Sequence, residues 1–110
     1  MDESLYHARA AATFRTLLDL FDDIDPDQAD VESSGDVISI AYANGKRCII
    51  NTQRPTRQLW LAADDRAWHF SFDEARGQWF DDRGSGAELV QTVQGLNQRL
   101  MTGVRSPPAP

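Results

Sequence analysis

The spacing of apolar residues changes twice along this chain, and these changes limit the folds that it can adopt. Apolar side chains recur at intervals of three or four from residue 4 to about residue 23, which is the period of an amphipathic helix. A period of two then predicts strands over residues 30–33, 37–43, 47–52, 57–63, 67–72 and 78–82. The helical period returns after residue 85. The predicted order is therefore a helix, a run of strands and a second helix.

Local signals predict where these elements begin and end. Ser4 is a candidate N-cap for the first helix, and Pro26 disfavours helical geometry at the residue before it. The dipeptide Asn44-Gly45 favours a tight hairpin because both residues accept positive φ. The run Ser85-Gly86-Ala87-Glu88 matches a capping box that would open the second helix. Gly103 is the predicted stop of that helix.

Together these elements predict an α+β fold of two layers. Consecutive strands joined by short connections form an antiparallel meander, and two amphipathic helices need one face of that sheet to cover. The other sheet face is then left to solvent. We expect a single domain over residues 1–103 and an irregular Pro-rich tail over residues 104–110.

Acidic residues are concentrated in the first third of the chain. Residues 1–36 contain ten Asp or Glu and two Arg, a net charge of −8, whereas residues 37–110 contain seven acids and nine Lys or Arg, a net charge of +2. No Lys or Arg occurs in residues 16–45. Such a field favours cations or a basic protein surface as partners, and it disfavours nucleic acid.

Several classes of protein are disfavoured by what the sequence lacks. No apolar run approaches the roughly 18 residues of a membrane span, so no membrane partner is expected. The first residues do not have the basic and apolar segments of a secretory signal, and we expect a cytoplasmic protein. Cys48 is the single cysteine, which excludes an internal disulfide and a Cys-based zinc site. We expect it to be a small core residue.

The acidic side chains form the first candidate site. Asp19, Asp22 and Asp23 share one face of the predicted helix, where like charges cost about 0.2–0.5 kcal/mol per pair. They also stand at the C-terminal end of that helix, where the dipole favours cations. A pattern that breaks two local rules is typical of a functional site. A charged face that serves solubility is the alternative.

Carboxylate oxygens are hard ligands that suit Mg²⁺, Ca²⁺, Mn²⁺ and iron. The alternating acids of residues 23–27 match the first three positions of an EF-hand loop. Gln28 stands where that loop needs Gly, and Ser34 stands where it needs Glu, so a preformed calcium site is disfavoured. The sequence therefore predicts a shallow and weak metal site on the surface. His7 is a further candidate ligand.

A tryptophan among amides forms the second candidate site. By strand alternation the solvent face of the sheet should carry Asn51, Gln53, Gln58 and Trp60. A Trp in such surroundings is typical of an anchor in a protein interface, and packing of this ring beneath a loop is the alternative.

No catalytic machinery is visible in the sequence. His7 and His69 are the two histidines, and neither forms part of a recognisable Ser–His–Asp or Cys–His set. His69 alternates with Trp68 and Phe70, so it is expected on the polar face of its strand without a further role. We expect a binding protein and not an enzyme.

Part of the sequence resembles the frataxin family, and in particular the bacterial branch of that family. The resemblance lies in Asn51-x-Gln53-x-Pro55-x-x-Gln58-x-Trp60-Leu61-Ala62, in the preceding Asn44-Gly45, and in the later Trp68-His69-Phe70 and Trp79. The acidic first helix fits the same family, and the resemblance covers residues 4–102. It implies a two-layer fold of helix, sheet and helix.

The resemblance also implies a function. Iron, as Fe²⁺ or Fe³⁺, would bind weakly at Asp19, Asp22, Asp23, Asp25 and Asp27, with Asp30 and Glu32 near the edge of the first strand. The protein would dock on the cysteine desulfurase and the scaffold protein of iron–sulfur cluster assembly, and it would modulate that assembly. Its partner surface would be Asn51, Gln53, Gln58 and Trp60, and it would be a monomer without iron.

Iron storage or detoxification with ferroxidase activity is the alternative function. A di-iron site of the kind built from paired Glu-x-x-His motifs is not present in the sequence, which disfavours this alternative.

Overall fold

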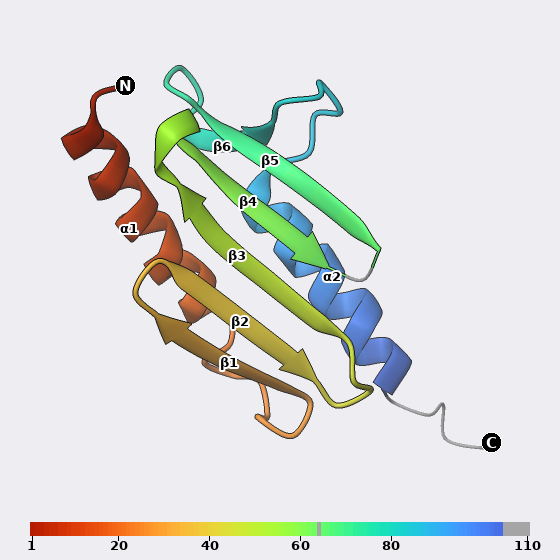
Figure 1. Ribbon diagram of the computed structural model, residues 1–110. Helices are drawn as coiled ribbons and strands as arrows, with labels where there is room; N and C mark the ends of the chain where they lie inside the picture. The colour runs from red at the N-terminus through yellow and green to blue at the C-terminus, as the bar shows by residue number, and fades with distance from the viewer. Residues whose placement is uncertain (64, 105–110) are drawn as a thin grey trace.

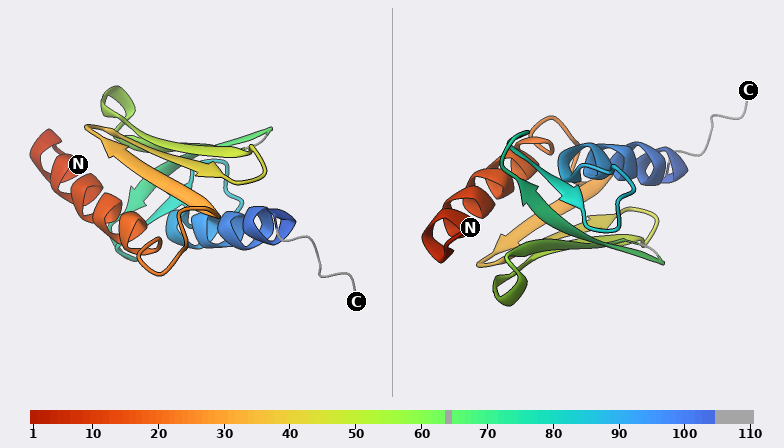
Figure 2. Two further views of the ribbon diagram at one scale, coloured as in Figure 1. Left: turned by 90° about the horizontal axis from the view of Figure 1, so that it is seen from below. Right: turned by 90° about the horizontal axis from the view of Figure 1, so that it is seen from above.

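The computed structural model describes residues 1–63 and 65–104. Its elements are α1 (Glu3–Asp19), β1 (Ala29–Ser34), β2 (Val37–Tyr42), β3 (Arg47–Gln53), the 3-10 turn η1 (Arg54–Thr56), β4 (Gln58–Ala63), β5 (Arg66–Asp73), β6 (Gln78–Asp81) and α2 (Leu89–Val104). The strands form one antiparallel sheet in sequence order, from β1 at one edge to β6 at the other. Both helices cover the same face of this sheet (Figure 1 and Figure 2), which confirms the predicted two-layer α+β fold.

The core lies between the helices and the inner face of the sheet. Alternate residues of the central strands point inward and are at most 1% exposed, namely Ile38, Ile40, Cys48, Ile50, Leu59 and Leu61. Burial of an aliphatic side chain of this size contributes about 1.5–3 kcal/mol. A slip of one residue in the register would turn this set toward solvent, so the alternation fixes both the register and the two faces of the sheet.

Helix α1 begins earlier and ends earlier than the sequence predicts. Asp2 caps it in place of Ser4, because the Asp2 carboxylate accepts a hydrogen bond from the backbone N–H of Leu5 at 2.8 Å. The helix ends at Asp19, and the next three amides donate to carbonyls three residues back. This tighter turn places Phe21 in the core, where it is 6% exposed.

Helix α2 begins later than the sequence predicts. Glu88 caps it in place of Ser85, since each of the two Glu88 carboxylate oxygens accepts a backbone N–H from the first turn at 3.0 Å. The Ser85 hydroxyl instead donates to Asp81 at 2.6 Å, and Gly86 has a φ of +83°, which a right-handed helix does not permit. A buried carboxylate at this end of the helix also complements the helix dipole.

The remaining boundaries differ little from the predicted ones. Each strand begins and ends within two residues of its predicted range, and the weakly predicted first strand is the edge strand β1. Helix α2 passes Gly103 and ends at Val104, so Gly103 is not its stop. The remainder of the predicted tail, residues 105–110, lies outside the described residues. No helix in the described part of the chain is long and apolar enough to cross a membrane.

Tyr6 joins α1 to the connection between β3 and β4. Its hydroxyl donates to the Gln58 carbonyl at 2.7 Å and accepts from the Gln53 N–H at 3.0 Å, and the residue is 0% exposed. The pKa of the Tyr6 phenol is raised above its ordinary value, mainly because the group is buried. The hydroxyl therefore stays protonated and can donate. One side chain of the helix therefore fixes the end of one strand and the start of the next.

Tyr6→Phe is expected to lower the free energy of unfolding by about 1–3 kcal/mol, because two backbone groups lose their partner while the ring packing is kept. Urea denaturation followed by circular dichroism would measure this loss. Thr56→Ala, which removes an exposed hydroxyl bonded to the Gln53 carbonyl at 3.3 Å, is the control and should change stability by less than about 0.5 kcal/mol. An unchanged midpoint for Tyr6→Phe would show that the bridge contributes nothing.

Candidate functional site

The sheet face that points away from the helices carries the predicted partner residues. Asn51, Trp60 and His69 stand directly opposite one another across β3, β4 and β5, and Gln53 pairs with Gln58 beside them. Each of these five residues is partly buried. All four residues that the alternation assigns to this face therefore lie on it, on the two middle strands of the sheet.

Two neighbours, His69 and Gln58, hold Trp60 in place. Its ring stacks on the His69 imidazole with centroids 4.1 Å apart and planes inclined by 12°, and its indole N–H donates to the Gln58 side-chain carbonyl at 2.9 Å. The Gln58 amide nitrogen in turn donates to Ser71 at 3.1 Å and to Asp82 at 2.9 Å. The Asp82 carboxylate also lies 4.0 Å from His69 Nδ1. A ring fixed in this way loses little conformational entropy on binding, which suits an interface anchor.

His69 is a residue of this site that the sequence prediction missed. The face of its strand was predicted, but its contact with Trp60 was not. Ala63 pairs with Arg66, so the short connection between β4 and β5 places Trp60 opposite His69 three residues further from the turn on each strand. Counting back from that turn is the signal that would have found the pair. The stack also covers one face of the indole, which explains why Trp60 is partly buried and not fully exposed.

Ile49 extends the same surface with apolar area. It is 42% exposed, and it stands opposite Ala62 on the outer face of the sheet, with Ala67 next in the row. An exposed isoleucine at the centre of a sheet does not serve the core, and it adds apolar area beside Trp60. The outer face thus combines an aromatic ring, amides and aliphatic side chains.

The predicted metal-binding acids are exposed and follow one another along the edge of the fold. Asp19 ends α1, Asp22 to Asp27 lie in the segment between α1 and β1, and Asp30 and Glu32 project from the outer face of β1. Because α1 ends at Asp19, the predicted α-helical spacing does not extend to Asp22 and Asp23. That part of the prediction was wrong, although the side chains do lie on the surface.

One acid of this segment also shapes the backbone. An Asp25 carboxylate oxygen accepts from the Asp27 N–H at 2.9 Å, and the Asp25 carbonyl accepts from Gln28 and Ala29 at 2.8 and 3.1 Å. Asp25 therefore organises the turn that leads into β1, as Asx residues commonly do.

The donor set suits hard cations at an open surface. Within residues 1–63 and 65–104, no three His, Cys, Asp or Glu side chains are grouped so that they could hold a metal ion. His7 is exposed near the start of α1, twelve residues before Asp19 and thus about 18 Å along the helix, so the structure does not bring it to the acids. Exposed carboxylates without an enclosing cage fit iron or another hard cation with low affinity.

Cys48 takes no part in this chemistry. The residue is 0% exposed in the core, and burial raises the pKa of its thiol to about 12. At neutral pH the thiol is therefore protonated, whereas metal binding requires a thiolate. The prediction that Cys48 is a small core residue is confirmed.

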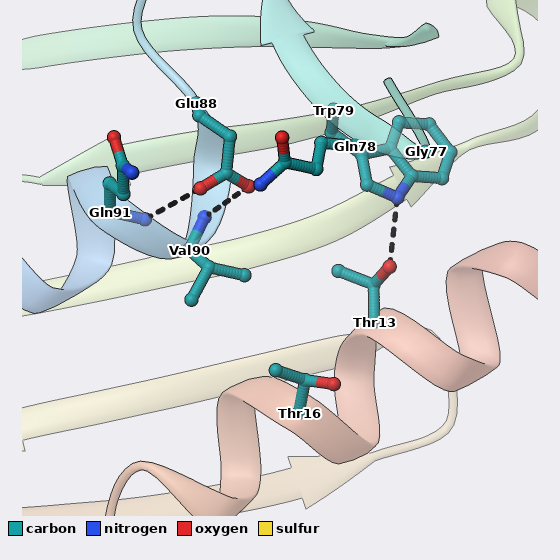
Figure 3. A pocket seen from close by; sticks show the side chains of 8 residues that line it. All are labelled: Thr13, Thr16, Gly77, Gln78, Trp79, Glu88, Val90 and Gln91. Atoms are coloured by element: carbon teal, nitrogen blue, oxygen red, sulfur yellow. Dashed lines mark hydrogen bonds between the residues drawn. The ribbon is translucent and has the colours of Figure 1, made fainter. Parts of the chain in front are cut away.

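A hollow of about 410 Å³ lies where α1, β6 and α2 meet (Figure 3). The Trp79 indole N–H donates to the Thr13 hydroxyl across it at 2.8 Å. Among the described residues that line the hollow, Glu88 carries the charge, and both of its carboxylate oxygens already cap α2. We assign this hollow to the junction of the two helices and not to a ligand.

Known proteins share both the sequence and the fold of this chain. The iron–sulfur cluster assembly protein CyaY of Ectopseudomonas mendocina (strain ymp) is 40% identical over 82 residues, which are 74% of each chain. The structure of frataxin from Psychromonas ingrahamii aligns with a TM-score of 0.74 and 24% identity over 90% of each chain. Trimeric frataxin from the yeast Saccharomyces cerevisiae, complexed with ferrous iron, aligns with a TM-score of 0.73 and 25% identity over 86% of each chain.

These likenesses confirm the predicted fold. The family profile described as a frataxin-like domain matches residues 1–102 of the 110, which includes α1, the whole sheet and most of α2. The acidic segment and the Trp60 surface both lie inside the matched range. The resemblance found in the sequence is therefore confirmed, and the chain belongs to the frataxin-like family.

Proposed function

We propose that this chain takes part in iron–sulfur cluster assembly, by binding iron weakly and by docking on the assembly machinery. The observation that carries the proposal is the outer sheet face, where His69 and Gln58 hold the Trp60 ring beside exposed apolar area. A relative named as an iron–sulfur cluster assembly protein, 40% identical over 82 residues, supports the role. The chain acts in this proposal as a binding protein and not as an enzyme.

Two kinds of surface lie on one face of the sheet, and each suits a different contact. Asp30 and Glu32 project from β1, and Trp60 projects from β4, which is three strand spacings or about 14 Å away across the sheet. The register adds a displacement along the strands, because Glu32 is in line with Ala62 and not with Trp60. The acidic edge would attract a basic patch on the cysteine desulfurase. The Trp60 region would contact the scaffold protein, with Asn51, Gln53 and Gln58 as adaptable hydrogen-bonding groups around the anchor.

Iron would bind at the acidic segment from Asp19 to Glu32. The carboxylates are exposed and hydrated, so each must be partly desolvated to bind a metal, and no enclosing cage compensates for that loss. This arrangement supports weak binding of Fe²⁺ or Fe³⁺ that can be released again. The yeast relative complexed with ferrous iron supports iron as the metal.

Asp22→Asn combined with Asp23→Asn is expected to weaken Fe²⁺ binding several-fold, because two of the acids in the segment lose their charge at nearly unchanged shape. The fold should keep its stability, since both side chains are exposed. Anaerobic titration followed by amide NMR would show iron broadening residues 19–32 in the parent and less so in the variant.

The matched control is Asp65→Asn combined with Glu74→Gln, which removes two exposed charges elsewhere and should leave iron binding unchanged. If iron instead broadens residues 80–100 and leaves residues 19–32 sharp, the metal assignment is wrong.

A pull-down of the cysteine desulfurase by this chain tests the proposed function as a whole. The immobilised chain is expected to retain the cysteine desulfurase and the scaffold from a bacterial lysate, with and without added iron. Rapid Fe²⁺ oxidation with mineral formation, without retention of either protein, would support the storage alternative.

A further inference from the structure

Three arginines line two adjoining hollows between α2 and the start of β5. The first hollow, about 260 Å³, includes Arg66, Trp68, Gly95 and Arg99 in its lining, and we call it the α2 trough. The second, about 360 Å³, shares Arg66 and Trp68 with the trough and adds Arg83. Arg99 comes from α2 and Arg66 from β5, so the fold brings together cations that are distant in the sequence.

The guanidinium groups of the trough form no ion pair with an acid in the described part of the chain. Arg9, Arg54 and Arg76 each lie within 4.0 Å of a carboxylate. For Arg66 and Arg99 no such partner occurs among residues 1–63 and 65–104. Neither guanidinium group is therefore held in an ion pair within the described structure, in a chain whose net charge is −6.

The lining of the trough keeps the charge of these arginines available. The Arg66 guanidinium carbon lies over the Trp68 ring, 4.6 Å from its centroid, and such a cation–π contact does not neutralise the charge of the guanidinium. Among the described residues that line the trough, none carries a carboxylate. The second hollow differs, since its lining includes Asp65 and Asp81, and Asp81 is bonded to Ser85. Of the two hollows, the α2 trough is thus the one with arginines and no acid in its described lining.

Gly95 keeps the trough open. A glycine in the interior of a helix destabilises it relative to alanine. A Cβ built at Gly95 would meet nothing within 4 Å, and the residue does not have a positive φ, so neither packing nor backbone conformation requires glycine here. The glycine does leave room in the trough that a longer side chain would fill.

The shape of the trough suits a protein segment better than a small molecule. Gln91, Gly95 and Arg99 are exposed and follow one stripe of α2, so the trough is open and extends about 12 Å along the helix. Its volume lies below the roughly 300–1,000 Å³ of typical small-molecule sites. An extended chain can place several carboxylates along such a groove.

We propose that the α2 trough docks an acidic segment of a partner protein, whose carboxylates pair with Arg66 and Arg99. The end of this chain does not have the required chemistry, because residues 105–110 contain Arg105 and no Asp or Glu. The site does not depend on the proposed iron or desulfurase contacts, which lie on the acidic edge and the outer sheet face. The chain would thus present surfaces of opposite charge to different partners.

A labelled peptide tests the proposal on the full chain. The probe is a blocked hexapeptide of alternating Glu and Ala with a fluorescein label, and its anisotropy is measured at low ionic strength. Arg66→Gln with Arg99→Gln is expected to weaken binding by about tenfold or more, since two charge-assisted contacts are lost. Arg15→Gln with Arg47→Gln removes two guanidinium groups outside the trough and should change the affinity by less than about twofold.

A second variant separates binding from folding. Gly95→Gln fills the trough without changing the charge, and it should also weaken the peptide about tenfold while thermal melting shows an intact fold. Equal binding of the peptide with Gln in place of Glu would overturn the proposal. Glutarate that binds as tightly as the peptide would overturn it in favour of a small-anion site. Self-association in sedimentation that disappears in the arginine variant would overturn it in favour of a second copy of the chain.

Discussion

Replacing Trp79 by alanine is expected to lower the free energy of unfolding by about 3–5 kcal/mol. The residue is 2% exposed, and its ring meets Phe72 and Tyr6 edge to face, at centroid distances of 5.2 and 6.2 Å. Its indole N–H also donates to Thr13 on α1, so the variant loses packing together with a hydrogen bond between the sheet and a helix. Urea denaturation would measure the loss.

Thr13→Val isolates the hydrogen bond in that measurement. It keeps the approximate volume of the side chain and should cost about 1 kcal/mol, well below the effect of removing the ring. A loss of less than about 2 kcal/mol for Trp79→Ala would show that the junction of α1, β6 and α2 does not stabilise the fold as its burial indicates.

Trp60→Ala is expected to affect binding more than stability, in contrast to Trp79→Ala. The ring lies on the outer face and is partly buried by His69, so its removal should destabilise the fold by clearly less than the removal of Trp79. The same change should weaken binding to the desulfurase and scaffold by about 2 kcal/mol or more, which is roughly thirtyfold in affinity. Denaturant melts and binding assays on the same two variants would separate the two effects.

His69→Ala tests how much the stacking of His69 on Trp60 contributes to the affinity. It removes the stacking partner and leaves the indole, so it should reduce affinity less than Trp60→Ala does. If Trp60→Ala unfolds the protein while binding per folded molecule is kept, the proposal that Trp60 is an interface anchor is wrong.

The two-layer fold could be predicted because its signals are local. Alternation set the faces of the strands, and Asn44-Gly45 marked the hairpin between β2 and β3, although Gly45 has the expected positive φ and Asn44 does not. The helix ends could not be read with the same accuracy. Asp2 competes with Ser4 as a cap, and Glu88 caps α2 because Gly86 turns the chain before it. Such choices depend on backbone conformation that a residue pattern does not specify.

The candidate sites also differ in how far local sequence signals could predict them. The acidic residues and the face of Trp60 follow from charge and from alternation, so the sequence contained them. The Trp60–His69 stack depends on the register between two strands, and the α2 trough combines Arg66 and Arg99 from elements that are far apart in the chain. These contacts arise from tertiary packing, for which the sequence pattern has no direct signal.

Through the Tyr6 hydroxyl, the backbone at the β3–β4 connection depends on whether α1 is docked on the other side of the sheet. Fraying of the first turns of α1 would remove the acceptor of the Gln53 N–H and the donor to the Gln58 carbonyl. The exchange of that single amide with deuterium would then report how often α1 detaches. Binding on the outer face that holds the β3–β4 connection would slow the exchange, and truncation before Tyr6 would speed it. The protection of one amide on the sheet therefore measures the docking of a helix on its other side.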